Sequence, residues 1–261
     1  MDRGNIEKIA QSSEDKLLLS KVWDKIQNGI RKNIPANSCF LTPRELEMTR
    51  FLFGNHEGIY TFGGYEEAER KMVVYLPDYL EEDDLCGQDS PLIALRATYY
   101  EADALSHRDF LGALMGSGIG RETVGDICVG KGSTDFFVTR EVAPYILQNF
   151  ESAGRTKLKI SQIPLADVVI PQAETQTLRD TVASLRLDSV LSAGFRISRS
   201  TAAEYIAAGK AAIDGIVCEK ADRLVSQGAK ISARGLGKMK LTAVNGQTKK
   251  GRISVVIDRY V

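Results

Sequence analysis

Residues that build disulfide frameworks and metal sites are scarce in this sequence. Its 261 residues include four cysteines and two histidines. The cysteines lie far apart without a C-x-x-C pair, and neither histidine has a second His or Cys at metal-ligand spacing. We therefore expect reduced, mostly structural thiols, and we expect neither a metal ion nor a cofactor.

Long apolar runs are absent too. No stretch free of Asp, Glu, Lys and Arg exceeds 11 residues, whereas a membrane-spanning helix needs about 20 apolar residues. The opening stretch MDRGNIEKIAQ lacks the apolar core of a signal peptide. We expect a folded cytoplasmic protein without membrane contact, and its 43% hydrophobic residues are enough to bury its cores.

The net charge of zero hides an uneven distribution along the chain. Residues 171–261 hold 15 Lys and Arg against 8 Asp and Glu, a net charge of +7, while residues 1–170 hold 19 against 26, a net charge of −7. The stretch 229–252 holds seven cations and no acid. This asymmetry indicates a polyanion-binding module attached to a body that does not bind polyanions.

The first segment, residues 1–56, is expected to be helical. Between residues 16 and 30, apolar side chains recur at the three- and four-residue spacing of an amphipathic helix. A second helix begins at TPRE, where Thr42 is the cap, Pro43 suits the first helical position and Glu45 completes a capping box. It should end near Gly54.

Strands and helices alternate in the middle segment, residues 57–165. Strand-like runs occur at IYTF, MVVYLP, LIALRATYY, DICV, FFVT and LKISQI, with helical stretches near 66–70, 107–115 and 140–152. This alternation predicts an α+β fold class and a ferredoxin-like middle domain.

A small α/β domain is expected at residues 181–261, after a linker at 166–180 that includes a proline and has no clear period. Apolar residues at i, i+3 and i+4 from Leu187 predict one short helix, and Ser198 is the expected cap of a second. The Asp-Gly pair in IDGI predicts a tight hairpin.

Two strands of this last domain carry cations on one face. In AKISAR and KMKLTA, apolar residues alternate with polar or basic ones, so the cations gather on the face opposite to the core. Polar strand faces are often merely solvated. Two such strands, with two more lysines in the following loop, favour an anion-binding surface.

Motifs of catalysis are incomplete. HRD at 107–109 lacks the Gly-rich loop and D-F-G of a kinase, and GSGIG at 116–120 lacks the last glycine of a dinucleotide fingerprint. RLD at 186–188 is similar to the catalytic loop of some pseudouridine synthases, but it falls in a predicted helix, so Asp188 is expected to be structural. We expect no catalytic residue.

The last domain resembles a known RNA-binding module. The ordered elements are R-L-D, S-R-S, G-K, the hairpin and R-G-x-G-K, within roughly residues 184–261. They resemble the alpha-L RNA-binding domain first described in a ribosomal protein of the small subunit. The resemblance implies that two helices and the adjoining loop hold structured RNA through its backbone.

The upstream half resembles a particular bacterial family. HRDFLGALMGSGIGRETVGDI at 107–127 and FFVTREVAPYI at 136–146 are similar to the YlmH family. This resemblance implies a helical start, an RRM-like middle domain and the alpha-L module. It also implies binding to a large ribosomal subunit that carries an obstructed peptidyl-tRNA, during rescue of nascent chains.

The RNA-binding surface is expected on the last domain. Because guanidinium groups bind phosphate bidentately, Arg186 and Arg199 are expected to contact phosphate, with side chains free to face RNA. Ser198 is expected to cap its helix and to touch phosphate. Gly235 is expected to allow a positive φ or a close approach to RNA, although a plain turn explains it as well. The further cations expected on the same surface are Lys210, Arg234, Lys238, Lys240, Lys249 and Lys250.

The function expected from these features is that of a non-enzymatic RNA-binding protein. Its partners would be structured rRNA or tRNA and the large ribosomal subunit, with a protein partner on the acidic first half. One alternative is an RNA-modifying enzyme, a pseudouridine synthase or an rRNA methyltransferase, that uses the domain for targeting. Another makes the first half a protein-interaction module and RNA binding secondary.

Overall fold

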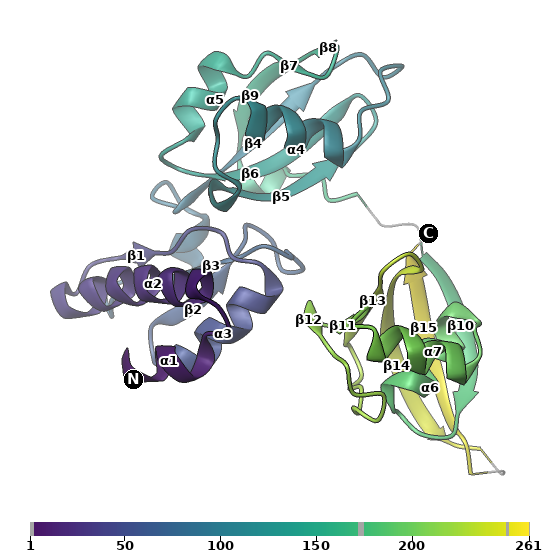
Figure 1. The fold of residues 1–261 in the computed structure, drawn as a ribbon. Coiled ribbons are helices and arrows are strands. Elements are labelled where there is room, and N and C mark those ends of the chain that lie inside the picture. Colours follow the sequence, from purple (N-terminus) through teal and green to yellow (C-terminus); the bar gives the residue numbers. More distant parts are fainter. Residues whose placement is uncertain (1–2, 172–174, 249–250, 261) are drawn as a thin grey trace. The chain divides into compact units, whose positions relative to one another are not determined.

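The computed structural model describes residues 3–171, 175–248 and 251–260, with only the backbone of Arg3. The chain divides into two compact units, Met1–Pro171 and Gln172–Val261. Helices and sheets occur in both, so the expected α+β fold class is confirmed (Figure 1).

Helices and a small antiparallel sheet open the first unit. The sheet has the strand order β1-β3-β2, and one hydrophobic core joins it to α2 and α3. The elements are η1 (Arg3–Asn5), α1 (Ile6–Ile9), α2 (Ser13–Lys32), β1 (Ala36–Asn37), α3 (Pro43–Phe53), β2 (Ile59–Phe62) and β3 (Met72–Tyr75).

The predicted start of α3 is confirmed. Thr42 Oγ1 accepts a hydrogen bond from the backbone N–H of Glu45, and the Glu45 carboxylate accepts one from the backbone N–H of Thr42 at 2.6 Å. Pro43 is the first helical residue and Gly54 is the C-cap. These contacts satisfy backbone donors that no helical carbonyl can reach.

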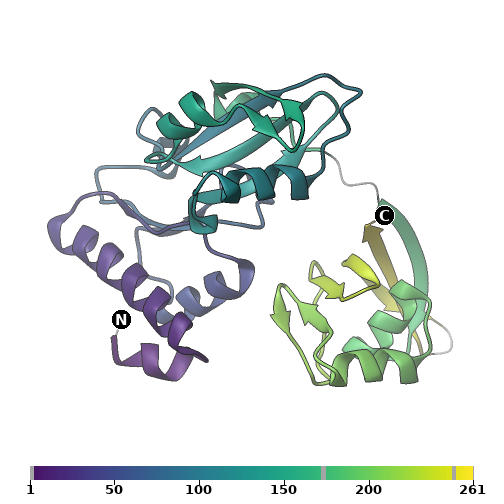
Figure 2. The same cartoon turned by 45° about the horizontal axis from the view of Figure 1, so that its top comes forward.

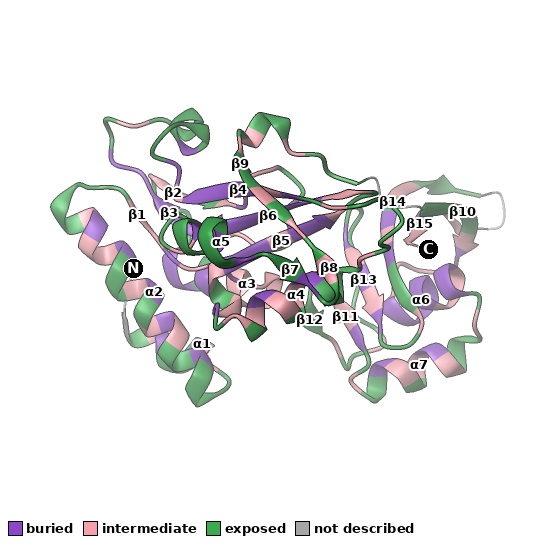
Figure 3. Cartoon of the chain, turned by 90° about the horizontal axis from the view of Figure 1, so that it is seen from above, coloured by how far each residue is buried: buried purple, intermediate pink, exposed green. Residues whose placement is uncertain are grey.

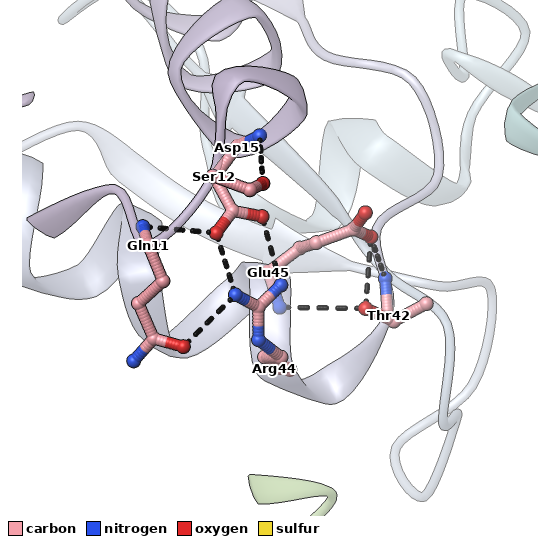
Figure 4. A network of polar contacts seen from close by, with 6 residues as sticks. All are labelled: Gln11, Ser12, Asp15, Thr42, Arg44 and Glu45. Atoms are coloured by element: carbon pink, nitrogen blue, oxygen red, sulfur yellow. Dashed lines mark hydrogen bonds and ion pairs between the residues drawn. The ribbon is translucent and has the colours of Figure 1, made fainter.

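Asp15 of α2 ties this helix to α3. Its carboxylate accepts two hydrogen bonds from the Arg44 guanidinium, at 2.8 and 2.6 Å, and one from the backbone N–H of Gln11 at 3.1 Å (Figure 4). The hydrogen bond from Arg44 is the largest influence on this carboxyl, and it lowers the pKa of Asp15 to about 2 although burial acts in the opposite direction.

A four-stranded antiparallel sheet with two helices completes the first unit. Its strand order is β5-β6-β4-β9, and the chain order βαββαβ with this arrangement is the ferredoxin-like fold. The sheet and its helices are β4 (Leu92–Thr98), α4 (His107–Gly116), β5 (Val124–Val129), β6 (Ser133–Thr139), α5 (Ala143–Asn149) and β9 (Lys159–Ile163). Smaller elements are η2 (Glu82–Cys86), η3 (Arg121–Thr123), β7 (Ser152–Ala153), β8 (Thr156–Lys157) and η4 (Leu165–Asp167). The βαββαβ arrangement thus begins at Leu92, later than the middle domain expected from residue 57.

Both faces of this sheet are buried. Alternate residues of β6 belong to two cores, because Phe136 packs with α4 and α5 while Phe137 packs with Met72 and Val74 of β3. Figure 3 accordingly shows β4, β5 and β6 mostly in the colour of buried residues. The first sheet therefore helps to cover the face of the second sheet that lies opposite its helices.

Two stretches of the first unit differ from the prediction. The helix expected near 66–70 is a series of turns, since the Asp126 carboxylate binds the backbone N–H groups of Glu69 and Arg70 at 2.7 and 3.1 Å. The helix expected at 140–152 is confined to α5.

The second unit is a six-stranded antiparallel sheet with two helices. Its strand order is β10-β15-β14-β13-β11-β12. The elements are β10 (Thr175–Val182), α6 (Leu187–Phe195), α7 (Arg199–Ala207), β11 (Ala211–Ile213), β12 (Ile216–Val217), β13 (Lys230–Ala233), β14 (Gly237–Gln247) and β15 (Ile253–Tyr260). The expected linker ended at residue 180, but β10 begins at Thr175, so a strand replaces its last part.

The two helices of this unit pack on one face of the sheet (Figure 2). The contact is close at Gly194 of α6, where a Cβ atom would lie 2.1 Å from Met239 Sδ of β14. The predicted hairpin is confirmed, because Asp214 and Gly215 have φ angles of 49° and 81° between β11 and β12.

Candidate nucleic-acid interface

Two arginines and one aspartate form a cluster at the N-terminal ends of α6 and α7. Arg186 is the N-cap of α6 and Arg199 is the first residue of α7. Asp188 Oδ2 accepts a hydrogen bond from Arg199 Nη2 at 2.7 Å, and Asp188 Oδ1 lies 3.3 Å from Arg186 Nε. Arg186 reaches Asp188 from the start of the same helix, and the packing of α6 against α7 brings Arg199 to the same carboxylate.

The charges of this cluster are unequally exposed. The Asp188 side chain is 9% exposed, while those of Arg186 and Arg199 are 42% and 54% exposed. Burial is the largest influence on the pKa of Asp188 and would raise it, but hydrogen bonds and charge from both arginines together lower it. The cluster carries one net positive charge, and its cationic groups face solvent.

The arginines differ from the prediction in one respect. Their side chains were expected to be free to face RNA, but both are held by Asp188. The pairing keeps the two guanidiniums next to one carboxylate before any ligand arrives, which reduces the ordering cost of binding a phosphate. Asp188 positions both arginines.

Ser198 caps α7 as predicted. Its Oγ accepts a hydrogen bond from the backbone N–H of Thr201 at 3.0 Å and also contacts the hydroxyls of Ser200 and Thr201. The residue is exposed and directly precedes Arg199. An anion at Arg199 would thus also lie near the start of α7, where backbone N–H groups favour negative charge.

Lys210 and Arg234 meet where β11 pairs with β13. The backbone N–H of Arg234 donates to the carbonyl of Lys210 at 2.9 Å, and Lys210 Nζ lies 5.3 Å from the centre of the Tyr205 ring of α7. Gly235 and Gly237 follow with φ angles of 86° and 112°, so both glycines serve a turn that side chains would strain. Gly235 is exposed, and a Cβ atom added to it would have no other atom within 4 Å.

The lysines of β13 and β14 lie on the other face of the sheet. Met239 and Leu241 are buried under the helices, so Lys238 and Lys240, which alternate with them, lie on the open face. Lys238 and Lys240 therefore lie on the face of the sheet opposite to α6 and α7, whose N-terminal ends hold Arg186 and Arg199.

The open face also contains an acid that the sequence pattern did not predict. Asp258 of β15 pairs in register with Lys240, which in turn lies opposite Lys230. The hydroxyls of Thr177 and Thr242 each donate to Asp258 at 2.6 Å, and these bonds, more than the charge of Lys240, lower its pKa. Lys249 and Lys250, predicted on the same surface, lie outside the described residues.

The segment 218–228 lies beside the arginine cluster and was not among the predicted site residues. The backbone N–H of Leu187 donates to the carbonyl of Arg223 at 2.8 Å, and Leu224 forms an isolated β-bridge with Arg186. Arg223 and Leu224 are exposed, so they add a cation and an apolar side chain to the surface beside the arginine cluster. The balanced charges of EKADR concealed the segment, because nothing in its composition indicates an anion-binding site.

The middle sheet does not present an open face for bases. In RRM domains, aromatic side chains on the sheet stack on two or three bases. Here Phe137 is fully buried between β6 and the first sheet, and Phe136 is fully buried under the helices. Stacking of RNA on these aromatic rings is therefore blocked in this fold.

Within the described residues, the structure offers neither a metal-binding group of three or more His, Cys, Asp or Glu side chains nor a helix long and apolar enough to cross a bilayer.

Both units of the chain match known protein families. Residues 97–167 match the family described as "Putative RNA-binding domain in YlmH", and residues 185–231 match the S4 domain. The chain is 32% identical over 222 residues to the ribosome-associated protein quality control protein P2 of Bacillus subtilis (strain 168), covering 84% of this chain and 85% of the relative.

One solved structure is also similar, the cell division protein ylmH from Streptococcus pneumoniae. It is 18% identical, its TM-score is 0.49, and the match covers 60% of this chain and 96% of that one. The match to the Bacillus relative extends over most of both chains, and the two domain matches lie in the two units of the fold. This chain belongs to the YlmH family of proteins with a C-terminal S4 domain.

Proposed function

We propose that this protein is a non-enzymatic RNA-binding protein of the cytoplasm that binds the large ribosomal subunit and takes part in quality control of stalled nascent chains. The name of the Bacillus relative, ribosome-associated protein quality control protein P2, supports the ribosomal context. The two domain families support the binding of RNA.

The observation that carries the proposal is the cluster of Arg186, Asp188 and Arg199. A buried carboxylate holds two partly exposed guanidiniums together on a unit whose net charge is +7. Guanidinium pairs of this kind suit the phosphate backbone of a folded RNA, which positions a protein without reading its sequence.

The proposed RNA contacts extend from this cluster along α7. Ser198 and Arg199 lie at its start, while Lys210, Arg234 and Gly235 lie beyond its end. An α-helix rises 1.5 Å per residue, so α7, Arg199–Ala207, spans roughly 12 Å between the two groups of contacts. Lys238, Lys240, Lys249 and Lys250 are proposed as secondary contacts.

Sedimentation with separated ribosomal subunits tests the ribosomal part of the proposal. The full chain should pellet with large subunits at low salt, and more strongly when they carry peptidyl-tRNA. Binding should fall as salt rises, because phosphate contacts release counterions. Equal pelleting with small subunits, or none with either subunit, would contradict the proposal.

The enzymatic alternative is tested on the RNA itself. Ribosomal RNA incubated with the protein, with and without a methyl donor, is digested and analysed by mass spectrometry. We expect no change in the RNA. A methyl group or a pseudouridine that appears only with the protein would favour the RNA-modifying enzyme.

A further inference from the structure

The first unit contains a pocket that the proposed function does not use. Its volume is about 480 Å³, within the range of about 300 to 1,000 Å³ of small-ligand sites. Residues of β1, of β3 and of the segment 79–91 line it, together with Arg140 and Glu141. The apolar part of the wall includes Pro35, Val74, Leu76, Leu80, Leu85 and Pro91.

One polar group in this wall lacks a partner. Ser90 is 4% exposed, and its Oγ is buried without a hydrogen-bond partner. Buried hydroxyls are nearly always hydrogen-bonded, and each exception calls for an explanation. Because Ser90 lines the pocket, a polar group of an occupant could make the bond that the protein itself does not make.

The charged groups around the pocket are mostly acidic. Asp84, Asp89 and Glu141 line it, and neither Asp89 nor Glu141 forms an ion pair among the described residues. Arg140 is the only basic side chain of the lining, and its guanidinium donates to the carbonyl oxygens of Ser90 and Gln88. The arginine thus stabilises the wall, and the acids determine the charge that an occupant meets.

These features favour a protein segment over a nucleic acid. The first 170 residues carry a net charge of −7, so they repel phosphate and attract cations. Tyr79 at the pocket is 60% exposed, and exposed tyrosines are enriched where proteins bind each other.

We propose that this pocket binds a short basic segment of a protein partner. An apolar side chain of the segment enters the pocket, a backbone group hydrogen-bonds to Ser90 Oγ, and a neighbouring Lys or Arg pairs with Asp89 or Glu141. The proposal does not depend on RNA binding by the second unit, so either proposal can fail without the other.

Fluorescence anisotropy of the full chain tests this with a labelled hexapeptide of alternating Leu and Lys. We expect saturable binding, and binding about tenfold weaker when Glu replaces every Lys or Ser replaces every Leu. Equal binding of the Leu-Lys and Ser-Lys peptides would mean that charge alone acts, and it would overturn the proposal.

Two double variants test whether the peptide binds at the pocket. The double variant Asp89→Lys with Glu141→Lys should bind the Leu-Lys peptide about tenfold more weakly. Glu101→Lys with Glu151→Lys, at two exposed acids outside the pocket lining, makes the same charge change and should have little effect. An equal loss in both double variants would overturn the proposal, as would no loss in the first.

Ser90→Ala tests the unpartnered hydroxyl. The variant should bind the peptide several-fold more weakly, while its thermal unfolding midpoint stays the same or rises, because a buried group without a partner is removed. Unchanged affinity would contradict the role given to Ser90. A labelled oligouridine whose binding is strengthened in the Asp89→Lys, Glu141→Lys variant but not in the Glu101→Lys, Glu151→Lys variant would identify nucleic acid as the occupant instead.

Discussion

The buried carboxylate of Asp188 determines how the predicted RNA-binding arginines can be tested. Reversing the charge of both arginines would surround a 9% exposed carboxylate with further negative charge, so unfolding and loss of binding could not be separated. A single neutral substitution leaves Asp188 with one cationic partner and therefore separates these two effects.

Arg199→Gln is the corresponding prediction. RNA affinity should fall about tenfold, because one charge-assisted contact is lost. The free energy of unfolding should fall by only about 1 kcal/mol or less, since Arg199 is 54% exposed and Arg186 still pairs with Asp188. Filter binding and urea denaturation measure the two effects.

Arg179→Gln is the matched control for this variant. Arg179 is exposed on β10, outside the cluster, and its substitution removes the same charge. It should leave RNA affinity within about twofold of the parent, because a distant exposed charge acts mainly through screened electrostatics. Equal losses in the two variants would show that net charge, not the cluster, determines affinity.

Helices and turns were predicted correctly from the sequence where the contacts that stabilise them are formed by residues close together in the chain. The start of α3, the cap of α7 and the Asp-Gly hairpin depend on residues within a few positions of each other, and all are confirmed. The same holds for the alternation in β13 and β14, which identified their buried residues.

Elements that depend on distant contacts were not predicted. Strand β10 has only Leu178 and Val182 buried, and it is ordered by pairing with β15, about 80 residues later. The glutamate-rich stretch 66–70 favours a helix, but Asp126 binds its backbone N–H groups in another conformation. The ion pair between Asp188 and Arg199 likewise depends on the packing of α6 against α7.

The hydrogen bonds from Arg44 of α3 to Asp15 of α2 predict how stability depends on pH. The depressed pKa of Asp15 stabilises the fold above its unfolded value of 3.8, and this contribution is lost as pH falls towards about 2. The shift corresponds to about 2 kcal/mol. From about pH 5 to about pH 2, the free energy of unfolding of the parent should therefore fall by about 2 kcal/mol more than that of Asp15→Asn. Urea denaturation at each pH measures both. Parallel pH profiles would contradict this role for Asp15.

The two faces of the second unit can be compared with equal charge changes. We expect Arg199→Gln with Lys210→Gln, on the side of α7, to weaken RNA binding more than Lys238→Gln with Lys240→Gln on the open face. The reason is that Asp258 lies beside Lys240 and offsets part of the positive charge there. Filter binding at one salt concentration measures both variants, and the reverse order would move the principal contact to the open face.

At the scale of the whole molecule, the two units differ in net charge and in which of their surfaces are exposed. The first unit is acidic, and its ferredoxin-like sheet is covered on both faces. The second unit is basic and has a hydrophobic core formed only from its own residues, so it should fold alone. The central claim is that the second unit carries the RNA affinity.

Filter binding of residues 1–171, residues 172–261 and the full chain to large-subunit rRNA across a salt series tests this claim most directly. The fragment 172–261 should retain most of the affinity of the full chain, with a log–log salt slope of roughly −3 to −7, as expected for about five to eight phosphate contacts. The fragment 1–171 should retain little affinity. Equal affinity of the two fragments, or a slope near zero for the second, would contradict the account.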